Sequence, residues 1–97
     1  MTWIKIVPPA EADAHLRQCY EAVYALYPPE YGAEPPDALR RPDGSCDSIV
    51  AAHSLIPEAL RHAMSAFGVL LSPELPLSRR QHEMITTLVS ALNRCFY

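Results

Sequence analysis

Two side chains near the end of the chain, Cys95 and Glu83, have the types and the spacing for thiol chemistry. Cys95 follows Asn93, a residue that tolerates the left-handed conformation in which helices end, so the cysteine could lie at the start of a further helix. The backbone N–H groups and the dipole at such a start favour thiolate over thiol. Glu83 is expected at the edge of an apolar helix stripe, where it could relay a proton. The alternative for Glu83 is a solvated glutamate in the first turn of a helix.

The remaining cysteines and histidines indicate no further site. Cys19 falls inside an apolar stripe and is expected as a small core residue, while Cys46 stands beside a proline-rich segment without partners of its own. His15 is expected on the surface. His53 and His62 are too far apart for a pair of ligands on one helix, and no Cys or His cluster has ligand spacing. We therefore predict no metal and no cofactor.

The element that must position Cys95 and Glu83 is a helix in residues 77–97. Ser78 and Gln81 have the spacing of a capping box, and the preceding prolines keep the helix from beginning earlier. Large aliphatic residues then recur at helical spacing on one face: Met84, Ile85, Leu88, Val89 and Leu92. The opposite face carries polar residues, so the segment is an amphipathic helix.

The rest of the chain predicts more helices and no strands. Apolar periodicity indicates a helix from about Ala10 to Tyr27 and another from Pro57 to about Ser72, in which Gly68 suggests a close approach of another backbone. A short helix ending near His53 would be capped by Ser45 or Asp47. Residues 1–9 form an apolar arm that is expected to pack across a helix or a neighbouring subunit, and residues 28–45 form a proline-rich loop. The fold class is therefore all-α, a single domain of about four helices.

Three separated stretches of the sequence carry a resemblance. They are Trp3 to Ala12, His53 to Leu60 and Leu77 to Tyr97. In this order they resemble the AhpD-like peroxidases, which are related to carboxymuconolactone decarboxylases. That family's pattern is a glutamate, then Cys-x-x-Cys, then a histidine a turn later, and Glu83 and Cys95 fall at the spacing of the glutamate and the first cysteine. The second cysteine would be the residue after Tyr97.

The resemblance implies an AhpD-like helical domain, shortened relative to the family, and a thiol peroxidase that takes a peroxide substrate and a thiol electron donor. It assigns Cys95 to the resolving thiol and Glu83 to the proton relay. Because the attacking cysteine and the histidine are missing, weak or no activity is expected. The alternative is a non-catalytic helical oligomerisation module on the same scaffold. Since helices of a shortened domain need partners, we expect a homo-oligomer.

Composition sets the remaining limits. The formal net charge of −3 gives no basic face for nucleic acid, so a helix-turn-helix DNA-binding protein is disfavoured. No apolar run approaches the roughly 18 residues of a membrane span, and the N-terminus lacks the pattern of a signal peptide. Three cysteines without framework spacing indicate reduced thiols. We therefore expect a cytoplasmic protein that binds neither nucleic acid nor membrane.

Overall fold

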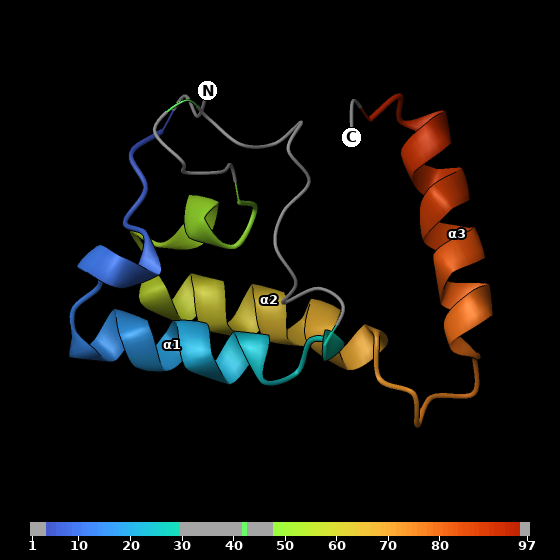
Figure 1. Ribbon diagram of the computed structural model, residues 1–97, viewed down its shortest axis with the longest axis horizontal. Helices are drawn as coiled ribbons and strands as arrows, with labels where there is room; N and C mark the ends of the chain where they lie inside the picture. The colour runs from blue at the N-terminus through green and yellow to red at the C-terminus, as the bar shows by residue number, and fades with distance from the viewer. Residues whose placement is uncertain (1–3, 30–41, 43–47, 96–97) are drawn as a thin grey trace.

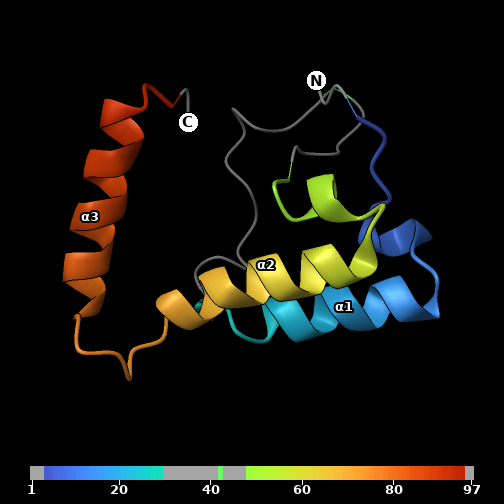
Figure 2. The same ribbon diagram turned by 180° about the vertical axis from the view of Figure 1, so that it is seen from behind.

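The computed structural model describes residues 4–29, 42 and 48–95, which form helices and no strands. The elements are, in order, η1 Pro9–Glu11, α1 Ala14–Tyr24, η4 Ala51–His53, α2 Pro57–Leu70 and α3 Arg79–Leu92. α1 and α2 lie side by side and run in the same direction, and α3 stands apart from them (Figures 1 and 2). The all-α prediction is thus confirmed for the described residues, with three α-helices and two 3-10 helices instead of about four helices.

α1 begins later than its apolar periodicity predicts. Asp13 is the N-cap, and its Oδ1 accepts a hydrogen bond from the backbone N–H of Leu16 at 2.8 Å. The preceding residues form the separate turn η1, and Ala12 between the two elements is extended. A capping side chain satisfies an N–H that otherwise lacks a partner, so it fixes the start of the helix where periodicity alone cannot. The predicted start at Ala10 is therefore wrong by four residues.

The core lies between α1 and α2. Leu16, Cys19, Tyr20 and Val23 of α1 are buried together with Leu60 of α2, and Val50 and Ala51 close the same cluster. At the other end of the pair, the ring of Tyr27 packs edge-on against Phe67 with 5.7 Å between centroids. The two helices therefore share contacts along their length, and the core prediction for Cys19 is confirmed, since 2% of this residue is exposed.

The N-terminal arm is bound to this core through Val7. Its N–H donates to Ser54 Oγ at 2.7 Å, and its carbonyl accepts from the Tyr20 hydroxyl at 2.7 Å. Ile6 and Val7 pack against the buried cluster. The prediction that the arm packs across a helix is confirmed for its described residues.

Two predictions lie wholly or partly outside the described residues. These are the caps Ser45 and Asp47 and most of the proline-rich segment 28–45. Within the described part, the N-cap of η4 is Val50 and makes no side-chain capping bond, while Ser48 Oγ accepts from the N–H of Ala51 at 3.2 Å. No described helix has the length and apolar character needed to cross a bilayer.

Candidate functional site

The start of α3 follows from its sequence. The Ser78 hydroxyl accepts from the N–H of Gln81 at 3.3 Å, and the Gln81 side chain accepts from the N–H of Ser78 at 2.8 Å. These reciprocal bonds form the predicted capping box, which is confirmed. Because two helix-start donors are satisfied locally, α3 begins at a defined residue without help from the rest of the fold.

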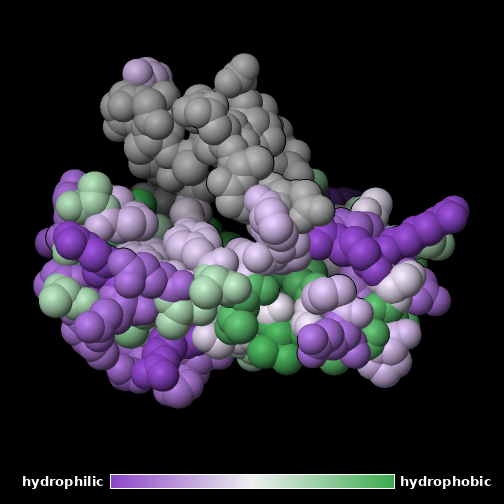
Figure 3. Space-filling model, turned by 60° about the horizontal axis from the view of Figure 1, so that its bottom comes forward, coloured by the Kyte–Doolittle hydropathy of each residue, from purple (hydrophilic) through white to green (hydrophobic). Residues whose placement is uncertain are grey.

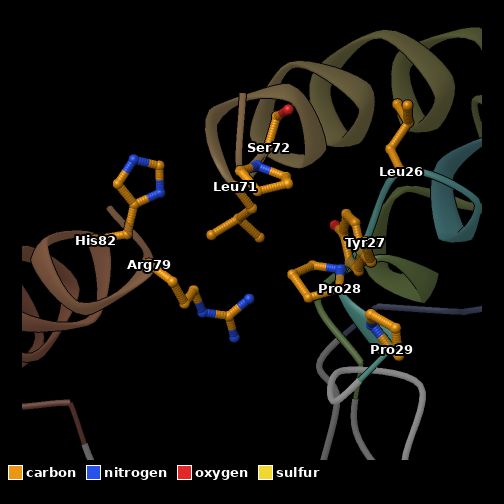
Figure 4. Close-up of a pocket in the computed structure, with 9 residues that line it drawn as sticks. Leu26, Tyr27, Pro28, Pro29, Leu71, Ser72, Arg79 and His82 are labelled. Carbon is orange, nitrogen blue, oxygen red and sulfur yellow. The ribbon is translucent and has the colours of Figure 1, made fainter. Parts of the chain in front are cut away.

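The apolar stripe of α3 is exposed. Its five members have exposed fractions between 50% and 73%: Met84, Ile85, Leu88, Val89 and Leu92. His82 is the buried residue of this helix, and it lies near Leu71 at the end of α2 (Figure 4). α3 therefore presents a polar side to the α1–α2 pair and its most apolar side to solvent, the reverse of the usual arrangement for an amphipathic helix.

Glu83 lies on the polar side of α3. Its Oε1 pairs with Arg79 Nε, one turn earlier, at 2.7 Å. Residues three, four and seven apart share a helix face, so Glu83 is aligned with Arg79, Thr86 and Ser90. The expected position at the edge of the apolar stripe is therefore wrong, since each residue advances about 100° around the helix and Glu83 falls opposite the stripe.

Cys95 lies just beyond the C-terminus of α3 and is exposed. Its N–H donates to the carbonyl of Ser90 at 3.0 Å, and the N–H of Arg94 donates to Ala91 at 3.1 Å. This pair of bonds is a Schellman motif. Arg94, with φ 54°, takes the left-handed position, whereas Asn93 keeps a helical φ of −78°. The expectation for Asn93 is therefore wrong by one residue, because the helix continues one residue further before it turns.

α3 separates the two predicted site residues, because Glu83 lies in its first half and Cys95 just beyond its end. Cys95 comes twelve residues after Glu83 in the sequence, which at the helical rise corresponds to about 18 Å. A proton relay needs contact within hydrogen-bond reach or through one water. Within one chain, then, Glu83 does not reach Cys95. The further helix that was expected to begin at Cys95 would lie in residues outside the described part, as does Cys46.

A cleft of about 340 Å³ opens between α3 and the chain that follows α1. Tyr27, Pro28 and Leu71 line its apolar side, and Arg79 extends its side chain toward them (Figure 4). Burial raises the pKa of the Tyr27 phenol above its ordinary value of 10.0, so this hydroxyl is neutral at physiological pH. Arg79 is already paired with Glu83. The cleft offers an apolar surface with a compensated charge at its edge, and neither Cys95 nor Cys19 lines it.

Comparison of the chain with known protein families, with curated proteins and with solved structures gives no match. The resemblance to the AhpD-like peroxidases therefore rests on the sequence motifs alone.

Proposed function

We propose that this chain is a helical association module, and that α3 binds a second copy of the chain through its apolar stripe. The observation that supports this proposal is the exposure of the whole stripe: Met84, Ile85, Leu88, Val89 and Leu92 are each at least half exposed. Large contiguous apolar surface of this kind marks interaction sites in folded proteins. The α3 stripe is therefore a better candidate for function than the cleft.

The composition of the α3 stripe favours a second copy as its partner. None of the five side chains is charged, so two copies of the stripe meet without repulsion. Ile85, Leu88 and Leu92 also have the three-and-four spacing with which helices interlock side by side. A surface that is complementary to itself produces a closed dimer about a two-fold axis.

The α3 stripe supplies a driving force of the size that association requires. Burying one large aliphatic side chain contributes about 1.5–3 kcal/mol, and at least half of each stripe side chain remains to be buried. Five such side chains on each copy give an apolar contribution of the same order as the association cost, which is about 4–15 kcal/mol. We therefore expect a weak dimer, whose population depends on protein concentration. Val69 and Leu70 at the end of α2 are also exposed, and apolar side chains gather on the face shown in Figure 3.

Sedimentation velocity over a concentration series tests the proposal with two matched variants. Leu88→Glu places a charge in the stripe, whereas Thr87→Glu places the same charge at an exposed neighbouring position off the stripe. We expect the unmodified chain and Thr87→Glu to dimerise, and Leu88→Glu to remain monomeric with unchanged helix content. A compact monomer at every concentration, or equal association of both variants, would refute the proposal.

A second candidate function is an alkylhydroperoxidase-like thiol peroxidase, which the exposure of Cys95 favours. Of the two cysteines in the described part, Cys95 is exposed and Cys19 is buried, so Cys95 is the one that a peroxide can reach. In this candidate Cys95 is the attacking thiol, not the resolving thiol that the resemblance implies. Its thiolate attacks one peroxide oxygen, the O–O bond breaks, the sulfur becomes a sulfenic acid and the leaving alkoxide takes a proton from solvent water. An external thiol then displaces water to form a mixed disulfide, which a second donor thiol reduces.

Peroxide consumption with a dithiol donor separates this candidate from association alone. We expect Cys95→Ser to abolish consumption and Cys46→Ser to retain it. If the unmodified chain consumes no peroxide above the rate of the donor alone, the chain has no peroxidase activity and the association role remains by itself.

A further inference from the structure

Four side chains with metal-binding chemistry meet where α1 and α2 begin. α1 contributes His15 and Cys19, which are four residues apart, and α2 contributes Glu58 and His62, also four apart. Residues at this spacing share one helix face. The two helices run parallel and side by side, so their first turns lie together (Figure 1). Glu58 contacts both His15 and His62 with its carboxylate.

The distances are close to those of a metal site. His15 Nε2 lies 3.1 Å from Glu58 Oε1, and the ligand atoms of His15, Cys19 and Glu58 all lie within 4.8 Å of one another. In a tetrahedral zinc site, bonds of about 2.0–2.3 Å place neighbouring ligand atoms about 3.3–3.6 Å apart. Small rotations of the exposed His15 and Glu58 side chains therefore suffice to close the three donors on one ion.

The second oxygen of Glu58 has a partner of its own. His62 Nε2 lies 3.4 Å from Glu58 Oε2, whereas His15 contacts Oε1. A partner that holds the outer oxygen of a ligating carboxylate fixes its orientation, as outer-shell groups do in metal sites. His62 thus prepares Glu58 to present its other oxygen to an ion.

We propose that His15, Cys19 and Glu58 form a binding site for a zinc-type divalent cation, with water at the fourth position. The set of one imidazole, one thiolate and one carboxylate matches the ligands of zinc and cobalt, whereas calcium and magnesium need oxygen ligands alone. The side chains of His15 and Glu58 are 58% and 54% exposed and give the ion an entry path. Cys19, with 2% exposed, forms the floor of the site.

Simple pairing of His15 with Glu58 is the competing explanation for this cluster. An exposed pair contributes at most about 1 kcal/mol to stability and does not involve a thiol. The two explanations therefore differ at Cys19. A metal ion must bind the sulfur as thiolate, whereas an ion pair leaves the sulfur unchanged.

Cobalt titration tests the site through that sulfur. The protein used is the full chain with Cys46→Ser and Cys95→Ser, so that Cys19 is its remaining thiol. We expect one Co²⁺ per chain, a thiolate-to-cobalt charge-transfer band, the intense visible bands of tetrahedral cobalt, and loss of both when Zn²⁺ is added. Zn²⁺ should also raise the melting temperature, since it binds the folded chain.

Variants at exposed positions keep the test independent of the core. His15→Gln and Glu58→Gln should each weaken Co²⁺ binding at least about tenfold. His53→Gln is the matched control, because His53 lies outside the cluster with its Nδ1 2.8 Å from the carbonyl oxygen of Ile49. Absence of the charge-transfer band in the folded chain, or a band that both cluster variants leave unchanged, would overturn the proposal.

Discussion

Replacing Gly68 with alanine reverses the usual sign of that substitution. Alanine in the interior of a helix is ordinarily favoured over glycine by about 1 kcal/mol. At Gly68, however, an added Cβ would lie 2.7 Å from Leu26 Cβ and 3.3 Å from the nearest Tyr27 ring atoms. Two carbon atoms at such a short distance must move apart. Because Leu26 Cβ is bonded directly to its own backbone, the segment that follows α1 would have to move away from α2.

The size of the effect follows from these opposing terms. Overpacking a well-packed contact costs typically 1–3 kcal/mol, and the upper part of that range, about 2–3 kcal/mol, applies where backbone must move. Subtracting the gain of about 1 kcal/mol in helix propensity leaves the net effect. We expect a net loss of about 1–2 kcal/mol for Gly68→Ala. In a domain of this size, that loss lowers the melting temperature by roughly 4–16 °C.

Urea denaturation of the two single variants, Gly68→Ala and Leu26→Gly, and of the double variant that combines them measures the contact directly. Leu26→Gly removes the Cβ that the new methyl would meet, so the double variant should lose less stability than the two single changes added together. Gly68→Ala as stable as the parent chain, or strict additivity, would show that the helices are not in contact at this point.

Two further results are expected from the end of α3. Arg94→Gly should stabilise the chain by a few tenths to about 1 kcal/mol, because Arg94 has φ 54° and glycine adopts that conformation without strain. Thermal unfolding of Arg94→Gly and Arg94→Ala measures this difference. Equal stability of the two variants would contradict the prediction. Alkylation of the native chain, followed by mass spectrometry, should modify Cys95 quickly and Cys19 only on unfolding, because Cys95 is exposed and Cys19 is buried; equal rates would show that the core opens.

Local signals in the sequence predicted the helices well where a side chain caps the backbone. The capping box of Ser78 and Gln81 and the proline in the first turn of α2 gave starts that the structure confirms. The start of α1 was missed because apolar periodicity does not locate the capping residue, which is Asp13. Gly68 does lie at a close approach, but its nearest neighbours are the Cβ of Leu26 and the ring of Tyr27, not the backbone that was expected.

The candidate sites depend on contacts between segments that are far apart in sequence. Twelve residues separate Glu83 and Cys95 in the sequence, and one continuous helix between them places the two side chains about 18 Å apart. The His15, Cys19 and Glu58 cluster has no ligand spacing within a single segment, so the sequence did not predict it. The signal in the sequence is a pair of possible ligands at four-residue spacing on each of two amphipathic helices. Only the parallel packing of α1 and α2 shows that the two pairs lie together.

The parallel arrangement of α1 and α2 also bears on how the chain folds. Two neighbouring helices that run in the same direction cannot be joined by a short turn, and here the connection runs from Ala25 to Ile56. Closing a loop of that length costs about 3 kcal/mol of chain entropy before any contact between the helices forms. The cost grows only with the logarithm of loop length, so insertions in this connection should slow folding slightly. Cutting the connection would instead turn the closure into an encounter between two separate fragments.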